Sequence, residues 1–156
     1  MIRNTKMLHF GCCSNEYGSL VPIEGSGGIP FEIKRVYYIF GVDQGIRRGF
    51  HSHRNLEQAL VCVHCSVKIH VETPDASEEV LLNNPREALY IGPMVWREMY
   101  DFSDDAVLLV LASEHYLVSD YIRDYRVFLK EATEYFSEED RDRKPEARSV
   151  RPAFFP

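Results

Sequence analysis

Short runs of β-branched and aromatic residues recur along residues 20–112, and turn-forming residues separate them. The runs occupy residues 33–42, 59–63, 67–71, 88–91, 97–102 and 107–112, with clusters of glycine, proline, serine, asparagine or aspartate at residues 25–28, 73–75, 83–85, 92–93 and 103–105. Residues 59–63 and 67–71 look like the two arms of a hairpin. Many short strands at nearly regular spacing favour an all-β sandwich or barrel over a parallel α/β sheet.

The pattern changes after residue 118, where apolar residues recur at helical spacing. This spacing predicts an amphipathic C-terminal helix that packs on the barrel or on a partner. The apolar residues are Tyr121, Ile122, Tyr125, Phe128, Leu129, Ala132 and Phe136. Residues 137–151 are dense in charge and lack an apolar face, so we expect them to be solvated or disordered, although Phe154 and Phe155 could dock. A chain of 156 residues suits a single domain over 1–156, with the barrel at about 1–118 and the helix and charged tail at about 119–156.

Composition excludes several classes of function. The formal net charge of -6 argues against a nucleic-acid-binding surface, which needs an excess of Lys and Arg. No apolar run approaches the roughly 20 residues that a membrane helix requires, and no secretory signal is visible at the start of the chain. We therefore expect a cytoplasmic protein with no nucleic-acid and no membrane partner. Five basic residues could still form a local anion pocket or lie on solvated strand edges: Lys34, Arg35, Arg47, Arg48 and Arg54.

The four cysteines give a weak signal for metal or redox chemistry. Cys12 and Cys13 are adjacent, and Cys62 and Cys65 form one Cys-x-x-Cys group within a β-rich stretch. Residues three apart on a strand face opposite sides, which is the wrong arrangement for binding one ion. We expect Cys62 and Cys65 to be buried or turn cysteines.

Two histidines two residues apart, His51 and His53, lie in a segment that otherwise reads as a strand. Alternate side chains of a strand share a face, so the two imidazoles should point the same way. They would make either half of a metal site or the acid/base groups of an enzyme.

The spacing around these histidines fits the first signature of the cupins, with Gly45, His51, His53 and Glu57 in register. In a metal-binding cupin, the side chains at the positions of His51, His53 and Glu57 hold an ion. A second signature near a proline-centred turn adds another histidine as a ligand. That second stretch follows Gly92 here and carries Arg97 and Glu98 where the histidine would be sought. A guanidinium cannot lose its proton to become a ligand, so we expect no metal and no cofactor.

Longer blocks between Tyr17 and Tyr125 resemble the dTDP-sugar 3,4-ketoisomerases. The blocks cover about two thirds of the chain and are Tyr-Gly-Ser-Leu-Val-Pro-Ile-Glu-Gly from Tyr17, Ile-Pro-Phe-Glu-Ile-Lys-Arg-Val-Tyr-Tyr-Ile from Ile29, Arg-Gly-Phe-His-Ser-His from Arg48, Tyr-Ile-Gly-Pro-Met-Val-Trp-Arg-Glu-Met from Tyr90, and Leu-Ala-Ser-Glu-His-Tyr from Leu111 with Asp-Tyr-Ile-Arg-Asp-Tyr. The resemblance implies a metal-free cupin, that is, a double-stranded β-helix or jelly-roll barrel, forming a homodimer that shares strands. One departure is His64-Cys65, where the family more often has an Asn-Gly-like turn.

The same resemblance implies the reaction: dTDP-4-keto-6-deoxy-D-glucose becomes the 3-keto sugar, which a pyridoxal-phosphate-dependent aminotransferase then converts for surface glycans. Moving the carbonyl requires a base for the C3 hydrogen, a donor for the developing oxyanion and exclusion of water. His51 is the expected base, as both its imidazole chemistry and the resemblance suggest. His53 should orient His51 or hydrogen-bond a sugar oxygen, and Tyr37 could donate to the enediolate or a hydroxyl, or could be a core tyrosine.

Four further residues are candidates for binding the substrate. Arg97 could hold the oxyanion or the diphosphate, and Tyr17 could close over the sugar. Arg35 and Arg48 could hold the diphosphate, since arginine forks match phosphate oxygens, or could pair with carboxylates. The combination of Tyr17 and Arg97 looks like the branch of the family whose product keeps the gluco configuration at C4.

Four other functions remain open on the sequence. They are a dTDP-sugar 3,5-epimerase, a galacto-forming 3,4-ketoisomerase, a non-catalytic cupin that binds a sugar nucleotide or small ligand, and a metal-dependent dioxygenase. Product analysis, hydrogen exchange at C3 and elemental analysis separate them.

Overall fold

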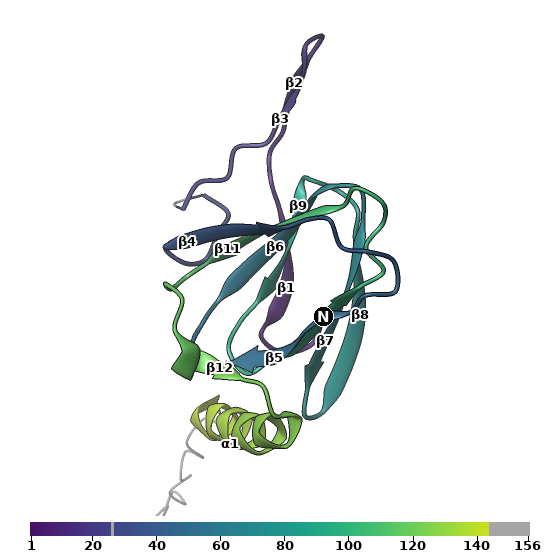
Figure 1. Ribbon diagram of the computed structural model, residues 1–156. Helices are drawn as coiled ribbons and strands as arrows, with labels where there is room; N and C mark the ends of the chain where they lie inside the picture. Colours follow the sequence, from purple (N-terminus) through teal and green to yellow (C-terminus); the bar gives the residue numbers. More distant parts are fainter. Residues whose placement is uncertain (26, 144–156) are drawn as a thin grey trace, which may run out of the picture.

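Two five-stranded antiparallel sheets pack against each other, and one long helix lies across one end of them (Figure 1). The computed structural model describes residues 1–25 and 27–143. Its elements are β1 (Thr5–His9), β2 (Cys13–Asn15), β3 (Gly18–Leu20), β4 (Arg35–Ile39), β5 (Arg48–His53), β6 (Gln58–His64), β7 (Val67–Thr73), β8 (Ala76–Leu82), β9 (Glu87–Ile91), β10 (Trp96–Tyr100), β11 (Val107–Ala112), the 3-10 turn η1 (Val118–Asp120), β12 (Tyr121–Ile122) and α1 (Tyr125–Arg143). The predicted all-β fold with a C-terminal helix is confirmed.

The sheet order differs from the predicted hairpin of residues 59–63 with 67–71. One sheet has the order β1-β9-β6-β11-β4 and the other β12-β5-β10-β7-β8, so β6 and β7 lie in different sheets. Cys65 between them has a left-handed φ of 58°, and the chain passes there from one sheet to the other. The hairpin prediction is therefore wrong: the link at His64-Cys65 joins two different sheets.

The hairpin partner of β7 is β8, which the sequence did not reveal. The two strands pair from Val67 opposite Leu82 to Thr73 opposite Ala76. β8 begins Ala-Ser-Glu-Glu and is largely exposed at the edge of its sheet, so it carries little of the apolar signal that marks a strand. β1, β2 and β3 also precede the region in which strands were predicted.

The core between the sheets comes from the inward faces of strands that alternate as expected. In β7, alternate residues Val67, Ile69 and Val71 are fully buried and the intervening residues are partly exposed. They pack with residues of the opposite sheet, among them Leu60, Leu89 and Leu108.

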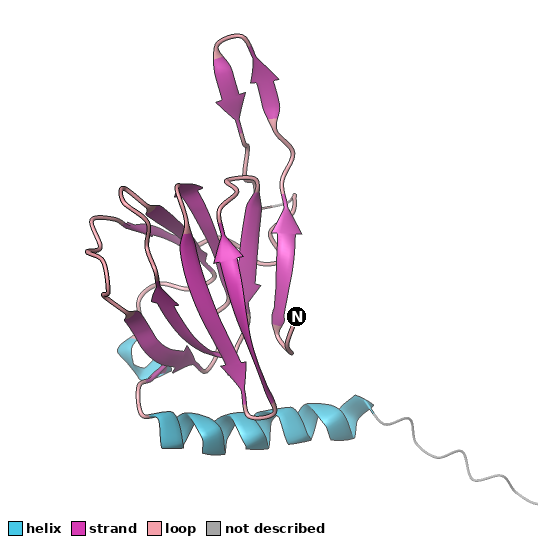
Figure 2. Cartoon of the chain, turned by 90° about the vertical axis from the view of Figure 1, so that its right-hand side faces the viewer, coloured by secondary structure: helices cyan, strands magenta, loops and turns pink. Residues whose placement is uncertain are grey.

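Helix α1 begins at Tyr125, so Tyr121 and Ile122, assigned to the helix from their spacing, form strand β12 instead. The helix lies below the barrel (Figure 2). Its buried residues Phe128, Ala132 and Phe136 form one apolar cluster with Trp96. No helix in the described part of the chain combines the length and the apolar character needed to cross a bilayer.

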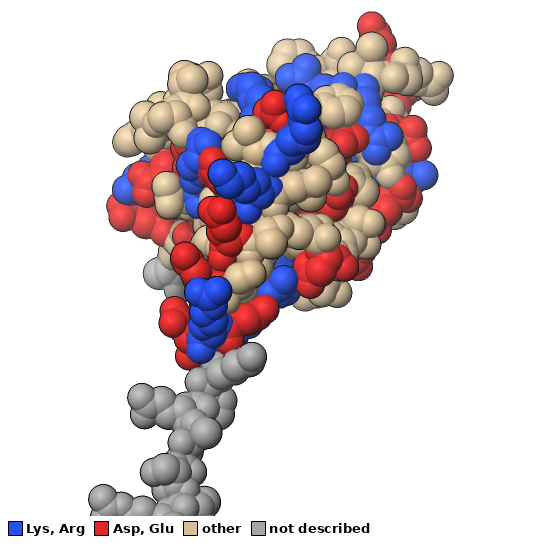
Figure 3. Space-filling view, turned by 90° about the horizontal axis from the view of Figure 1, so that it is seen from below, with Lys and Arg blue, Asp and Glu red and all other residues tan. Residues whose placement is uncertain are grey.

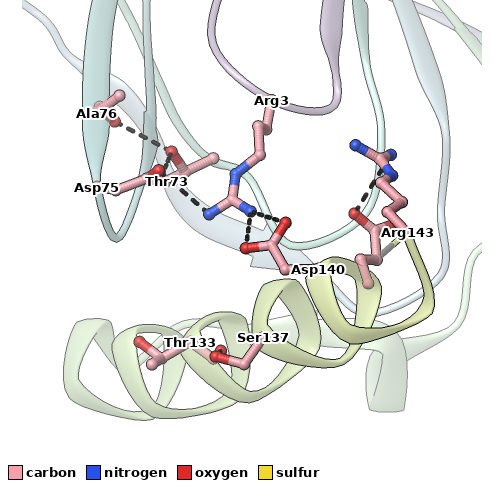
Figure 4. Close-up of polar contacts among 9 residues, drawn as sticks. Arg3, Thr73, Asp75, Ala76, Thr133, Ser137, Asp140 and Arg143 are labelled. Atoms are coloured by element: carbon pink, nitrogen blue, oxygen red, sulfur yellow. Dashed lines mark hydrogen bonds and ion pairs between the residues drawn. The ribbon is translucent and has the colours of Figure 1, made fainter. Parts of the chain in front are cut away.

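The helix continues through residues 137–143, which are helical but almost all exposed, so of the two expected states, solvated or disordered, they show the solvated one. The rest of that predicted segment, residues 144–151, lies outside the described residues. Arg3 contacts the helical part of this segment: its guanidinium lies 3.2 Å from the Asp140 carboxylate and 3.1 Å from that of Asp75 (Figure 4). The same guanidinium lies 4.3 Å from the centre of the Phe136 ring. Seen from below, the described acidic and basic side chains are interspersed (Figure 3). Phe154 and Phe155 lie outside the described residues.

We expect Phe128→Ala to lower the free energy of unfolding by about 3–5 kcal/mol, because it opens a cavity in a fully buried position. Urea unfolding followed by far-UV circular dichroism measures the change. The neighbouring Val127 is exposed, so Val127→Ala should change stability by less than about 0.5–1 kcal/mol. Equal effects of the two substitutions would contradict the packing of α1 on the barrel.

Candidate active site

A β-bulge in β5 aims the two histidines into the barrel. His51 lies opposite Arg97 and Gly49 opposite Glu98, so Phe50, with a φ of 54°, is the extra residue. Gly49 has a φ of 99°, and a Cβ there would lie 2.7 Å from the Arg97 carbonyl oxygen, so only glycine fits. Beyond the bulge, the rings of His51 and His53 lie with their centres 4.9 Å apart, edge to face, as the two-residue spacing predicts.

Arg97, on β10, brings an unpaired positive charge to the same place. Its side chain is 1% exposed, and no guanidinium nitrogen has a hydrogen-bond partner among the described residues. Burial lowers the pKa of Arg97 to about 10, so the group remains charged at neutral pH. A buried charge without a partner costs several kcal/mol. The arrangement therefore favours an anionic ligand at this position.

Both histidines are neutral in this environment. Burial, followed by the charge of Arg97, lowers the pKa of His51 to about 3 and lowers that of His53 further. His53 is fully buried, and its Nδ1 lies 3.0 Å from Oδ2 of Asp120. An imidazole that is neutral at pH 7 can accept a proton, which is what a general base must do.

Tyr37 on β4 points into the same region. Its hydroxyl accepts a hydrogen bond of 2.9 Å from the Gln58 side-chain amide, and burial raises the pKa of Tyr37, so the phenol stays protonated. The charge of Arg97 acts on Tyr37, and the Arg35 guanidinium lies 5.3 Å from the Tyr37 ring centre. Tyr37 can therefore offer a proton or a hydrogen bond to an oxygen in the site.

A cavity of about 420 Å³ opens beside these groups, which is within the range of small-molecule sites. Its lining consists of Arg35, His53, Asn55, Leu56, Glu114, His115, Tyr116, Leu117, Asp120 and Tyr121. His53 borders this cavity, and the ring of His51 lies against Tyr121 of the lining, with ring centres 5.1 Å apart.

Tyr121 and Asp120 were missed as site residues because the sequence pattern assigned Tyr121 to a helix. The Tyr121 ring centre lies 4.3 Å from the ring centre of His53, and the Arg123 guanidinium lies 4.5 Å from the Tyr121 ring centre. Asp120 sits in a single turn of 3-10 helix before a strand of two residues. Elements this short leave no periodicity from which their direction can be read.

Two predicted binding residues lie away from the cavity. Tyr17 is 88% exposed at the tip of the β2–β3 hairpin, which projects from the barrel (Figure 2). Arg48 is exposed at the start of β5 and is not among the cavity residues. Of the basic cluster, only Arg35 lines the cavity, because Lys34, Arg47 and Arg54 pair with Glu114, Glu98 and Glu131, respectively.

The third position of the cupin metal signature has a hydrogen-bond partner of its own. The Glu57 carboxylate accepts a hydrogen bond of 2.6 Å from the Tyr90 hydroxyl. Across residues 1–25 and 27–143, no three His, Cys, Asp or Glu side chains are grouped so that they could hold a metal ion. As expected, Cys62 is buried in a strand and Cys65 is exposed at a turn, and neither is in a disulfide.

A jelly-roll barrel with two imidazoles and a buried guanidinium in its interior defines a class of small-molecule cupins, and comparison with known proteins identifies the family. Residues 3–133 match the family described as FdtA: WxcM-like, C-terminal. TDP-4-oxo-6-deoxy-alpha-D-glucose-3,4-oxoisomerase of Aneurinibacillus thermoaerophilus is 47% identical over 80% of this chain and 90% of its own length. The chain belongs to this FdtA family of sugar-nucleotide ketoisomerases and is an isomerase.

Solved structures agree with the cupin fold. The 3,4-ketoisomerase QdtA of Thermoanaerobacterium thermosaccharolyticum, crystallised as a histidine-to-asparagine mutant with TDP-4-keto-6-deoxyglucose, is 51% identical with a TM-score of 0.85, over 87% of this chain and 99% of that one. Two Campylobacter jejuni enzymes each match 83% of this chain. The TDP-quinovose 3,4-ketoisomerase WlaRB is 46% identical with a TM-score of 0.80 over 99% of its length, and the TDP-fucose-3,4-ketoisomerase WlaRA is 32% identical with a TM-score of 0.78 over 96%.

Proposed function

We propose that this protein converts dTDP-4-keto-6-deoxy-D-glucose into dTDP-3-keto-6-deoxy-D-glucose. The observation that carries the proposal is the unpaired, buried guanidinium of Arg97 beside two neutral imidazoles. This combination supplies a base together with a cation for the oxyanion that the base creates. The complex of the QdtA relative with TDP-4-keto-6-deoxyglucose supports the same substrate.

The reaction begins at C3 of the sugar, whose hydrogen is acidified by the adjacent C4 carbonyl. His51 takes this proton, and the electron pair moves onto the C4 oxygen to give an enediolate. The guanidinium of Arg97 and the protonated hydroxyl of Tyr37 stabilise the negative oxygen. Return of the proton to C4 rather than C3, together with transfer of the hydroxyl proton from O3 to O4, leaves the carbonyl at C3 and a hydroxyl group at C4.

We further propose that the product has the gluco configuration at C4. The identity to WlaRB, whose substrate class is named for quinovose, is 46%, against 32% to WlaRA, which is named for fucose. Quinovose is 6-deoxyglucose and fucose is 6-deoxygalactose, so the comparison favours a gluco product. The presence of both Tyr17 and Arg97, which resembles the gluco-forming branch, points the same way.

The position of Tyr17 supports a homodimer. An exposed tyrosine on a hairpin that projects from its own barrel can close over a sugar only in the site of a second copy. The 3-keto product has a carbonyl ready for amination, so a pyridoxal-phosphate-dependent aminotransferase is the expected next enzyme. Four free cysteines are in keeping with the reducing cytoplasm.

Incubation with dTDP-4-keto-6-deoxy-D-glucose in D₂O, followed by NMR of the product, tests the substrate, the reaction and the stereochemistry together. We expect a 3-keto sugar with deuterium at C4 and an equatorial C4 hydroxyl. An axial hydroxyl would identify a galacto-forming enzyme, and inversion at C3 and C5 would identify an epimerase. Binding of the substrate without exchange at C3 would identify a non-catalytic protein.

The acid limb of kcat/KM should lie well below pH 6.5. His51 must be neutral in the free protein to act as a base. Because the pKa of His51 is about 3, the imidazole stays neutral at pH values far below 6.5, the ordinary imidazole pKa. Initial rates between pH 4 and pH 9, with recovery of activity at pH 7 as the control for acid unfolding, measure the profile. A limb between pH 6 and pH 7 would rule out this protonation state of the base.

A further inference from the structure

Gln58 is a polar residue at the start of an otherwise apolar, buried run in β6. The run reads Gln-Ala-Leu-Val-Cys, and Gln58 is only 3% exposed. Alternate residues of a strand share a face, so Gln58 faces the same way as Leu60 and Cys62, which pack in the core between the two sheets. A buried amide must be hydrogen-bonded to offset its desolvation, so an apolar side chain would suit this wall better.

The side-chain amide of Gln58 has a hydrogen-bond partner, the hydroxyl of Tyr37. Nε2 of Gln58 donates to that oxygen at 2.9 Å. The two residues come from the strands on either side of β11, where Tyr37 lies opposite Val110 and Gln58 lies opposite Ala112. Gln58 also lies opposite Ile91 of β9, so strands on both sides hold its backbone. The donor therefore has a fixed place beside the Tyr37 hydroxyl.

Donation by Gln58 determines where the hydroxyl proton of Tyr37 can point. An amide N–H group only donates, so the phenol oxygen accepts and its own proton must be directed elsewhere. Within the described residues, the Tyr37 hydroxyl has no acceptor for that proton. The charged groups that act on Tyr37 include the guanidinium groups of Arg35 and Arg97, which cannot accept a hydrogen bond. The proton is thus left for an oxygen of a ligand.

We propose that Gln58 is a positioning residue that directs the hydroxyl proton of Tyr37 toward the C4 oxygen of the sugar, where the negative charge of the enediolate develops. The inference rests on the isomerase function proposed above and extends it. Gln58 does not touch the substrate and acts through Tyr37.

The hydrogen bond from Gln58 also strengthens Tyr37 as a donor. Burial raises the pKa of Tyr37, and the hydrogen bond from Gln58 opposes this rise. The N–H group stabilises the partial negative charge that builds on the phenol oxygen while the hydroxyl donates to the sugar. Two hydrogen bonds in a chain strengthen each other in this way.

Gln58→Met removes the donor while keeping the length of the side chain. We expect kcat to fall by about tenfold or more, which corresponds to the loss of one hydrogen bond, but by less than the roughly 10²- to 10³-fold that loss of an oxyanion donor costs. KM and the affinity for TDP should change by less than about threefold, because Gln58 does not contact the substrate. Gln44→Met is the matched control, because Gln44 is exposed in the turn before β5 and should leave kcat unchanged.

A double-mutant cycle separates positioning from a structural effect. Tyr37→Phe alone should lower kcat by about 10²- to 10³-fold, since it removes the donor itself. In the Tyr37→Phe background, Gln58→Met should change kcat by less than about twofold, because no hydroxyl proton remains to be directed. A structural effect of Gln58→Met would lower kcat by the same factor in both backgrounds.

Carbon-13 NMR of the tyrosine rings reads the hydrogen bond without reference to turnover. The Cζ resonance of Tyr37, assigned by its loss in Tyr37→Phe, should shift in Gln58→Met and stay in place in Gln44→Met. Far-UV circular dichroism reports whether each variant is folded. If Gln58→Met does not fold, Gln58→Leu removes the same donor with a different shape and replaces it in the cycle.

Four results would overturn the proposal. They are an unchanged kcat in folded Gln58→Met, an equal loss of kcat with and without the Tyr37 hydroxyl, an unchanged Cζ resonance of Tyr37, or loss of folding in both variants of Gln58, which would show a structural role. Failure of the unmodified protein to isomerise the sugar nucleotide would instead refute the proposed function, while the NMR measurement would still report on the pairing of Gln58 with Tyr37.

Discussion

Replacement of His51 by asparagine is expected to lower turnover of dTDP-4-keto-6-deoxy-D-glucose by about 10²- to 10⁴-fold or more while leaving the affinity for TDP nearly unchanged. Loss of a general base typically costs this much. Asparagine is close to histidine in size and polarity but cannot take a proton, so the shape of the pocket persists and only the chemistry is lost. The ring of His51 contacts His53 and Tyr121, both of which remain.

Coupled measurements separate this chemical loss from a loss of structure. Single-turnover rates and C3 deuterium exchange report on the base, and calorimetric titration with TDP reports on binding. His9→Asn is a suitable control because His9 lies on β1 with its side chain largely exposed, where it pairs with Glu87. Normal turnover in folded His51→Asn would show that another group is the base, and His53 would be the first candidate.

Replacement of Arg97 by methionine is expected to affect activity and stability in opposite directions. The guanidinium is the only donor of permanent charge buried beside the histidines within the described residues, and removing a donor to a developing oxyanion typically lowers kcat by about 10²- to 10³-fold. In the absence of ligand the same charge is unpaired and desolvated. A methionine of similar length should therefore leave the free energy of unfolding unchanged or raise it, by up to about 4 kcal/mol.

Urea unfolding with and without TDP distinguishes the two contributions. Arg86→Met provides the control, because Arg86 is exposed on the loop before β9 and should alter neither quantity. If Arg97→Met lost several kcal/mol of stability, the guanidinium would be a structural group with partners in the protein. If it kept full turnover, the negative oxygen would have to be stabilised by Tyr37 alone.

The strands could be predicted from the sequence wherever one face is buried and the other is not. β7 shows this best, since its alternating residues Val67, Ile69 and Val71 face the core. The pairing between strands was harder to predict from the sequence, because the alternation of buried and exposed residues does not indicate which sheet a strand joins. The short connection at Cys65 looks like a hairpin turn by length, and only the left-handed backbone there and the pairing of β7 with β8 reveal the change of sheet.

The candidate site was predicted best where it lies on regular elements. His51 and His53 share a face because they are two apart on β5, and Arg97 meets them because β10 pairs with β5. Tyr17 could not be placed, since its position depends on a hairpin that leaves the barrel. Asp120 and Tyr121 could not be found because they lie in η1 and β12, which are too short to leave a pattern.

The Arg54 guanidinium donates hydrogen bonds to both carboxylate oxygens of Glu131, in the middle of α1. It also donates to backbone carbonyl oxygens of Ser119 and Tyr121, in the segment that lines the cavity. The helix consequently helps to hold the wall of the cavity in place, in addition to packing on the end of the barrel. Loosening of the helix would therefore release residues 119–121, including the end of strand β12 that pairs with β5, and would alter the wall of the cavity while the other strands keep their pairing.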